Sequence, residues 1–427
     1  MRLFRLGAAI LVGLACLTEQ QLIAEENARL RQVTDLLEAG DSTVRIVCFG
    51  DSITGIYYHT GGRRAWCDML GIALERVYPK AKLEMINAGA SGHTTVQGLA
   101  RIQRDVIAKK PHLVVVMFGM NDVCGRKDKQ FASNLKTIVG RCRESGAAVV
   151  LATPNSVYPN DRRPTERLAQ YAQIVRNVAG ERSVPLADCY RAYEEVRSKD
   201  ATEWMLLMSE TIHPGMNGHR LFAEVMAETI SGRRVSLADV APPNDALRFT
   251  FGRLKRRQPV SIVAMQPYDR LVPEVLGELF PGAEFRVTTW PVQEQSLAAI
   301  EQWGKGIRKQ KPDLVVVAVP AGLQGDDLEA FIRSYNWALN WSIGFGRAGW
   351  DLLPILPSVA GPLDAAGQKE EDLARRIIAG MDTKHLERGR DDDRTAKEML
   401  KDWIRKQTKE WSPKTGRKVT VSPSLQY

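Results

Sequence analysis

At 427 residues the chain exceeds the usual size of one domain, so two domains are expected. Its hydrophobic fraction of 44% and charged fraction of 26% are those of a folded globular protein, which excludes a disordered or fibrous chain. The formal net charge of +9 favours contact with acidic surfaces. No zinc-finger, RRM or basic-zipper pattern accompanies this charge, so a nucleic-acid partner is not expected.

The first predicted element is an export signal. Basic residues near the start precede an uncharged apolar run at 6–17, which is too short to span a bilayer but fits the core of a signal peptide. A signal peptide over residues 1–24 implies a secreted or periplasmic protein. The alternative is a lipoprotein box ending at Cys16, which the Gly at position 13 disfavours because Leu is usual there. No later segment is long and apolar enough to cross a membrane.

Residues 25–230 alternate between predicted helices and strands. Because the strands are short, apolar and separated by helices, we predict an α/β fold, a parallel sheet covered by helices on both faces. Active sites in such sheets lie at the carboxyl ends of the strands. The predicted helices are 25–40, 65–77, 94–109, 128–145, 164–179 and 217–230, and the predicted strands are 44–49, 83–86, 113–118, 147–153 and a short one around Leu186.

The second half of the chain repeats part of this pattern. After a predicted linker at 231–258, the Lys-Pro-Asp-Leu-Val-Val-Val run at 311–317 resembles Lys-Pro-His-Leu-Val-Val-Val at 110–116. In both halves a strand, a helix ending near Tyr/Phe-Pro, a second strand, a helix and the Val-rich strand follow in the same order. This favours a duplicated α/β unit over 259–400, although two unrelated domains could share such a pattern. Residues 401–427 are predicted to be a basic tail.

The cysteines do not indicate a disulfide framework. Of the six, five follow residue 24, and an odd number cannot all pair within one chain. No Cys-x-x-Cys pair or His/Cys cluster has the spacing of metal ligands, so no metal site is predicted.

Four short blocks, each at a predicted strand end or before the last helix, carry the candidate chemistry. They are Gly-Asp-Ser at 50–52, Asn-Ala-Gly at 87–89, Gly-Met-Asn at 119–121, and Glu-Thr-Ile-His-Pro at 210–214. In this order they resemble the SGNH hydrolase family, also called GDSL esterases and lipases, over roughly residues 43–230. The corresponding positions of the second unit lack Gly-Asp-Ser and Asp-x-x-His, so that unit is predicted to be degenerate and non-catalytic.

The resemblance implies a role for each site residue. Ser52 is the expected nucleophile and His213 the base, while the backbone N–H of Ser52, Gly89 and the Asn121 amide are the expected oxyanion donors. Glu210 stands where the family usually has Asp, and its longer side chain changes the reach of the carboxylate. A serine needs a neighbouring base to become a nucleophile, and acyl transfer needs donors aimed at the developing oxyanion. His93 is a candidate substrate-binding residue, with a packing role as its alternative.

The predicted function is therefore an exported serine ester hydrolase that forms an acyl-enzyme, acting on short acyl (acetyl) esters of carbohydrates. Lysophospholipase or thioesterase activity is the nearest alternative. A non-catalytic polysaccharide- or envelope-binding protein is a further alternative, but binding alone does not need this set of residues. No cofactor is implied.

Overall fold

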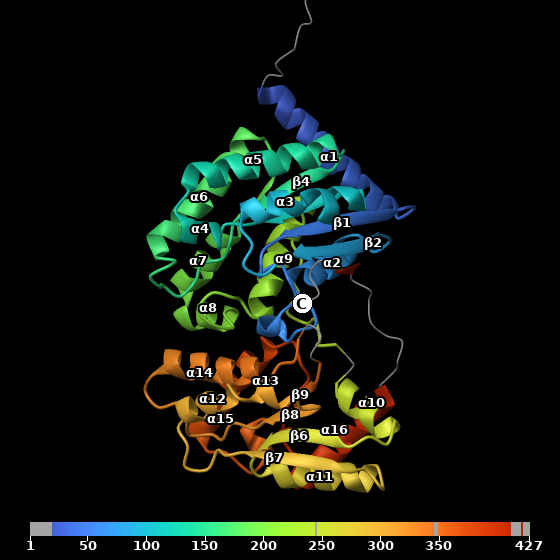
Figure 1. The fold of residues 1–427 in the computed structure, drawn as a ribbon, viewed down its shortest axis with the longest axis vertical. Coiled ribbons are helices and arrows are strands. Elements are labelled where there is room, and N and C mark those ends of the chain that lie inside the picture. Colours follow the sequence, from blue (N-terminus) through green and yellow to red (C-terminus); the bar gives the residue numbers. More distant parts are fainter. Residues whose placement is uncertain (1–18, 244–245, 346–348, 411–419, 422–427) are drawn as a thin grey trace, which may run out of the picture.

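The computed structural model describes residues 19–243, 246–345, 349–410 and 420–421. Two parallel sheets, each flanked by helices, lie one above the other in Figure 1. The α/β class and the second α/β unit predicted from the sequence are thus confirmed. Residues 1–18, with most of the predicted signal peptide and the alternative at Cys16, lie outside the described residues, as does most of the predicted basic tail.

The first sheet positions the candidate site. Its strand order is β10-β2-β1-β3-β4-β5, and every pair is parallel. Gly50 at the end of β1 is in register with Gly89 on one side and Met117 on the other, so three of the predicted blocks begin at one edge. The bounds are β1 Thr43–Gly50, β2 Lys82–Gly89, β3 Leu113–Met117, β4 Ala148–Ala152, β5 Leu186–Ala187 and β10 Thr420–Val421.

Helices cover both faces of this sheet, because each presents an apolar side to it. Helices α1, α2 and α9 pack together on one face, and α3, α5 and α6 on the other (Figure 1). Helices α7 and α8, and the single turn α4, are additions to the predicted elements. The bounds are α1 Glu19–Ala39, α2 Trp66–Val77, α3 Thr95–Asp105, α4 Asp122–Gly125, α5 Asp128–Glu144, α6 Thr165–Glu181, α7 Cys189–Lys199, α8 Ala201–Leu207 and α9 Met216–Ser231, with 3-10 turns η1 Tyr58–Thr60 and η2 Ile107–Lys109.

The second sheet, β7-β6-β8-β9, has its own hydrophobic core. Helix α10 lies within the segment predicted as a linker and buries Phe251 and Leu254 in this core. The bounds are β6 Val260–Met265, β7 Phe285–Trp290, β8 Leu314–Val317, β9 Asp351–Pro354, α10 Arg248–Lys255, α11 Tyr268–Leu279, α12 Leu297–Gly304, α13 Ile307–Gln310, α14 Leu328–Trp341, η3 Pro357–Val359, α15 Ala365–Ala379 and α16 Ala396–Glu410.

The two sheets share one topology. Strands β2-β1-β3-β4 of the first correspond in order to β7-β6-β8-β9 of the second. At the entry to the third strand, Lys110 and Lys311 both adopt a left-handed conformation, with φ of 51° and 48°. Two residues later, the His112 ring accepts a hydrogen bond from the Arg45 N–H, and the Asp313 carboxylate accepts one from the Ser261 N–H. Such agreement in detail supports a duplicated unit.

Polar contacts join the two units beside η1. Arg64 forms a two-pronged ion pair with Asp382, whose side chain is fully buried, at 2.6 and 2.7 Å. Gly61, with φ of 76°, has no room for a side chain, because a Cβ would lie 2.0 Å from the Met381 carbonyl oxygen. The backbone of the first unit therefore meets that of the second directly at this point.

Three further features bear on function. Among the described residues, no helix combines the length and the apolar character needed to cross a membrane. In the same part of the chain, His, Cys, Asp and Glu residues form no group of three or more suited to a metal ion. The five cysteines of the described part carry free thiols.

Candidate active site

Ser52 and His213 meet at the carboxyl edge of the first sheet. Ser52 lies in the loop after β1 and is 8% exposed, and His213 comes from the turn between α8 and α9. The Ser52 Oγ lies 2.8 Å from the His213 Nε2, which is hydrogen-bonding distance. The ring can thus take the hydroxyl proton.

Glu210 reaches the other nitrogen of the same ring. Its carboxylate accepts from His213 Nδ1, from the His213 backbone N–H at 2.9 Å and from the Ile212 N–H at 3.1 Å. Burial acts to raise the pKa of Glu210, but the hydrogen bonds and charge of His213 outweigh it, so the pKa lies below its ordinary value. The longer side chain is accommodated because the turn folds back, with the Ser209 and Glu210 N–H groups both donating to the His213 carbonyl.

Asn121 is held in one orientation by its neighbours. Its Oδ1 accepts from Arg163 Nη2 at 3.2 Å, and its Nδ2 donates to the His93 carbonyl at 3.0 Å, leaving a second amide hydrogen on Nδ2. Arg163 also donates to the Met120 carbonyl and is only 6% exposed. Arg163 was not among the sequence predictions, because a lone arginine in a loop ordinarily indicates a solvated surface.

Gly89, the last residue of β2, packs closely against the loop that follows β1. A Cβ at this position would lie 2.2 Å from the Gly55 nitrogen, so only glycine allows the two backbones to approach. Its N–H donates to Asn87 Oδ1 at 2.9 Å. Gly92, three residues on, has φ of 72°, and a Cβ there would meet nothing within 4 Å. Among the described residues, no acceptor is paired with the Gly92 N–H, so this N–H in the loop after β2 is free to donate to a substrate.

Buried polar groups fix the surrounding loops. Asp51 accepts from the Ile53 N–H, and Asp122 accepts from both the N–H and the hydroxyl of Thr95. Burial raises the pKa of Asp51 to about 7. Arg101, 5% exposed, ties the first two strand ends together by donating to the carbonyls of Gly50 and Ala88.

His93 lies beside this arginine and is partly exposed. Its Nδ1 accepts from Arg101 Nε at 3.2 Å. Burial, followed by the charge of Arg101, lowers the pKa of His93, so the ring is held neutral. The Asn121 amide donates to the His93 backbone carbonyl, so His93 lies next to the site. Substrate binding by its ring stays a prediction.

Two further histidines stack behind His213. The ring of His59 is nearly parallel to that of His213, with centroids 4.7 Å apart, and His219 follows at 5.7 Å from His59. His219 Nδ1 accepts from the Trp66 N–H at 2.8 Å. Burial, together with His213 and His219, holds the pKa of His59 well below its usual range, and burial lowers that of His219 to about 3. Both rings are therefore neutral in the folded protein.

This neutrality predicts a loss of stability in acid. Below about pH 6.5 both rings become protonated in the unfolded chain, whereas in the folded chain they stay neutral until much lower pH. Each ring therefore lowers the unfolding free energy by up to about 1.4 kcal/mol for every unit by which the pH falls. We expect His59→Phe, which keeps a flat ring, to remove its share of this slope between pH 6 and 4.5. Urea unfolding at several pH values measures it. The slope is compared with that of the wild type, because Asp51, with its raised pKa, acts in the opposite sense. An unchanged slope would show that His59 already carries a proton when folded.

The corresponding edge of the second sheet is built differently. Buried Tyr268 follows β6, as Ser52 follows β1. After β8, the N–H groups of Gly322 and Leu323 donate to the carboxylate of Glu370, from α15, at 2.9 and 3.2 Å. These two backbone N–H groups are thus already bonded to a carboxylate of the same unit, and none of the four blocks recurs there.

Comparison with known proteins agrees with this geometry. Residues 48–221 match the profile of the GDSL-like Lipase/Acylhydrolase family. This part of the chain is a GDSL-like (SGNH) acylhydrolase domain. The chain is 28% identical over 172 residues to an acetylxylan esterase of Geobacillus stearothermophilus, covering 37% of this chain and 76% of that protein. It is also 28% identical over 196 residues to an arylesterase of Vibrio mimicus, covering 46% of this chain and 92% of the relative.

Other similar proteins are named for further kinds of acyl hydrolase or have solved structures. The thioesterase 1/protease 1/lysophospholipase L1 of Escherichia coli (strain K12) is 27% identical over 186 residues, covering 43% of this chain and 82% of the relative. Among solved structures, the acetylxylan esterase Axe2 from Geobacillus stearothermophilus is similar at 25% identity and a TM-score of 0.38, covering 44% of this chain and 94% of Axe2. The family resemblance predicted from the sequence is confirmed for residues 48–221, which form an SGNH-type acylhydrolase domain. The predicted enzyme class agrees with this, because the relatives include an acetylxylan esterase and an arylesterase, both carboxylic-ester hydrolases.

Proposed function

We propose that Ser52, His213 and Glu210 form the catalytic triad of this hydrolase. The observation that carries the proposal is the unbroken line of hydrogen bonds from Ser52 Oγ through the two nitrogens of His213 to Glu210. His213 Nε2 takes the hydroxyl proton as Ser52 attacks the ester carbonyl, and the same proton passes to the leaving alcohol oxygen. Water, deprotonated in turn by His213, then releases the acid from Ser52. Glu210 keeps the acceptor lone pair on Nε2 by holding the proton on Nδ1.

For the oxyanion hole we propose the Ser52 N–H, the Asn121 amide and the Gly92 N–H. The expected third donor was Gly89, but its N–H is already bonded to Asn87, whereas that of Gly92 is open. Arg163 supports the role of Asn121, because it holds the amide oxygen and so turns the amino group toward the loop of His93. One preorganised donor of this kind contributes about 3–4 kcal/mol to lowering the barrier.

The proposed substrates are short acyl esters of carbohydrates, acetyl esters first. The similarity to an acetylxylan esterase supports this choice. Thioesterase or lysophospholipase activity is the second candidate, favoured by the similarity to the Escherichia coli enzyme. A purely binding function is disfavoured, because a hydrogen-bonded line from a serine through a histidine to a carboxylate is not needed for binding.

A substrate panel tests the proposal. We expect kcat/KM to be highest for acetylated xylo-oligosaccharides and for p-nitrophenyl acetate, and to fall as the acyl chain lengthens to octanoate. Lysophosphatidylcholine and palmitoyl thioesters should be poor substrates. Preference for the long acyl chains would support the second candidate, and absence of turnover together with failure of a fluorophosphonate to label Ser52 would reject catalysis altogether.

We also propose that the protein is exported. The apolar run at 6–17 supports this, as does 27% identity over 202 residues to the lipoprotein YqeF of Bacillus subtilis (strain 168). N-terminal sequencing of the protein from its native source tests the proposal. A start near residue 25 supports a cleaved signal peptide, an acylated Cys16 supports the lipoprotein alternative, and a retained Met1 rejects both.

A further inference from the structure

We propose that helix α14 of the second unit lines an elongated binding site for the carbohydrate chain that carries the ester. The proposal rests on the proposed function and assigns a role to the unit that lacks the catalytic blocks. Four residues spaced by four, Glu329, Arg333, Trp337 and Trp341, lie along one side of α14. At 1.5 Å per residue they extend over about 18 Å, which is long enough for several sugar units.

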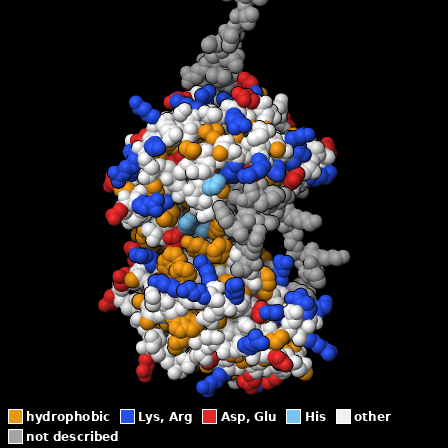
Figure 2. All heavy atoms as spheres, viewed as in Figure 1, with side chains coloured by type: hydrophobic (Ala, Val, Ile, Leu, Met, Phe, Trp, Pro, Cys, Tyr) orange, Lys and Arg blue, Asp and Glu red, His pale blue; other side chains and the backbone are white. Residues whose placement is uncertain are grey.

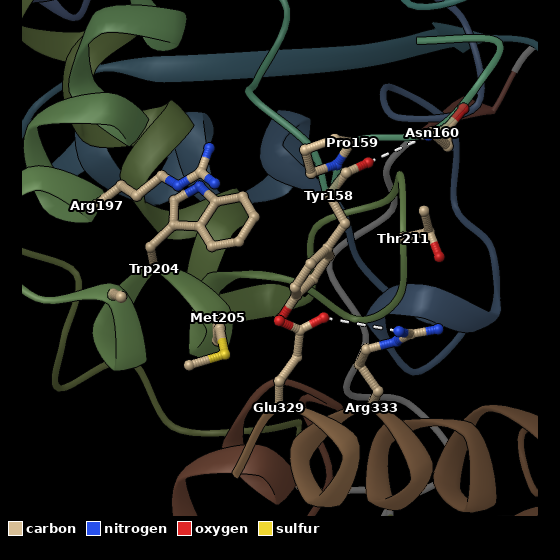
Figure 3. Close-up of a pocket in the computed structure, with 10 residues that line it drawn as sticks. Tyr158, Pro159, Asn160, Arg197, Trp204, Met205, Thr211, Glu329 and Arg333 are labelled. Atoms are coloured by element: carbon tan, nitrogen blue, oxygen red, sulfur yellow. Dashed lines mark hydrogen bonds and ion pairs between the residues drawn. The ribbon is translucent and has the colours of Figure 1, made fainter. Parts of the chain in front are cut away.

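One end of this strip forms a groove between the two units. The groove has a volume of about 420 Å³ and is lined by Glu329 and Arg333 from α14 and by Tyr158, Trp204 and Thr211 from the first unit, among others (Figure 3). The Arg333 guanidinium lies over the Tyr158 ring, 5.9 Å from its centroid. Because Thr211 stands between Glu210 and His213, the groove ends at the turn that carries the triad.

The other end is a cluster of aromatic rings, which we call the aromatic wall: Tyr57, Tyr58, Trp337 and Phe345. Tyr58 is stacked on Trp337 with centroids 6.2 Å apart and lies 6.4 Å from the His213 ring. Phe345 lies 5.7 Å from Tyr58 and 6.3 Å from Tyr57. All four side chains are partly exposed. Figure 2 shows hydrophobic and histidine side chains side by side where the upper and lower parts of the molecule meet.

Hydrogen bonds hold α14 against the turn that carries Glu210 and His213. Asn340 and Ser209 bond reciprocally, with Asn340 Nδ2 donating to the Ser209 carbonyl at 3.0 Å and the Ser209 hydroxyl donating to Asn340 Oδ1 at 3.0 Å. Asn336 donates to the Met208 carbonyl. Both asparagines are buried, so the position of α14 relative to His213 is fixed.

The chemistry of the strip fits the alcohol part of a sugar ester. His213 returns its proton to the leaving oxygen, so the alcohol part must lie on the His213 side, where the wall and the groove are. Trp337 is stacked on both Tyr58 and Trp341, so the partly exposed rings of the wall present their accessible apolar edges to the C–H groups of sugars. Charged groups such as Glu329 and Arg333 can bond hydroxyls. A lipid tail would require a continuously apolar lining, which the groove does not have.

The experiment compares variants on a chain-length series. Acetylated xylo-oligosaccharides of two to six units are measured beside ethyl acetate, whose alcohol part is too small to reach the strip. For Trp337→Ala and Arg333→Ala we expect the ratio of kcat/KM for the longest oligomer to that for ethyl acetate to fall by about tenfold. The deficit should grow with oligomer length and appear mainly in KM. Trp403→Ala is the matched control, since Trp403 is a partly buried tryptophan of the same unit on α16 and should leave the ratio unchanged.

The possible outcomes separate the binding site from the proposed function. Equal losses on both substrates, or a deficit independent of length, would reduce Trp337 to a structural role and overturn the proposal. If the wild type hydrolyses ethyl acetate but no acetylated oligosaccharide, the proposed function fails separately. The binding site is then tested by calorimetric titration of Ser52→Ala with unsubstituted xylohexaose, where binding that Trp337→Ala weakens supports the site and absence of binding overturns it.

Discussion

Replacing Ser52 by Ala is expected to lower kcat/KM for acetyl esters by on the order of 10⁴-fold or more, because no covalent acyl-enzyme can form. The residual rate would come from the oxyanion donors and from substrate binding. The side chain is small and its hydrogen-bond partner in the structure is His213, so the fold should be unaffected. Initial rates on p-nitrophenyl acetate and far-UV circular dichroism measure the two properties.

Ser91→Ala is a suitable control for this variant. Ser91 is an exposed serine on the neighbouring loop, and it uses its backbone N–H to contact the Tyr57 hydroxyl. We expect it to retain near wild-type activity. A folded Ser52→Ala protein that still hydrolyses esters at near the wild-type rate would show that another group is the nucleophile.

Replacing Glu210 by Gln is expected to lower kcat by about 10²–10⁴-fold while leaving KM for small esters little changed. A glutamine can donate to Nδ1 and so favour the tautomer with its proton on Nε2, which cannot accept the Ser52 proton. Glu195→Gln, at an exposed position on α7, is the control that removes a glutamate charge without touching the site. Unchanged kinetics in Glu210→Gln would reduce the triad to a Ser52–His213 pair, oriented by another group.

Glu210→Gln is also expected to change how the unfolding free energy depends on pH. The pKa of Glu210 is lowered in the folded state, so its charge contributes stability above the ordinary value of 4.5, and this contribution is lost as the pH falls through the folded value. The difference in unfolding free energy between wild type and Glu210→Gln should therefore be largest near neutral pH and shrink below about pH 4.5. A constant difference would indicate a packing effect instead of a lost charge.

Local sequence patterns were sufficient to predict the main strands and helices of both sheets. The central strands are mostly apolar, with β3 and β8 uninterrupted. The parallel topology places the residues at the carboxyl ends of β1, β2 and β3 at one edge, so the candidate site could be predicted from short blocks. The predicted helix at 94–109 ends at Asp105 and continues as the 3-10 turn η2, because Lys110 turns into the left-handed region before the next strand. Such ends depend on backbone conformation, which apolar spacing does not reveal.

Features that depend on contacts distant in sequence could not be predicted. Arg163 contacts Asn121 across a separation of 42 residues, and Asn340 contacts Ser209 across 131. His59 gave no local signal either, because its significance lies in stacking on a ring from another part of the chain. Gly89 shows the same limit: the family resemblance and its place at a strand end suggested a donor to substrate. Its packing on Gly55 and its bond to Asn87 are visible only in the folded structure.

The last strand of the chain has a practical consequence. β10 returns from the second unit to the first and pairs with β2 at Ile86 and Asn87, so it covers part of the outer edge of the first sheet. An uncovered edge strand offers unpaired N–H and C=O groups to any other chain and is a starting point for aggregation. Removal of the C-terminal residues Thr420 and Val421 would uncover that edge beside the catalytic unit, so a truncation before β10 is expected to make the protein more prone to aggregation.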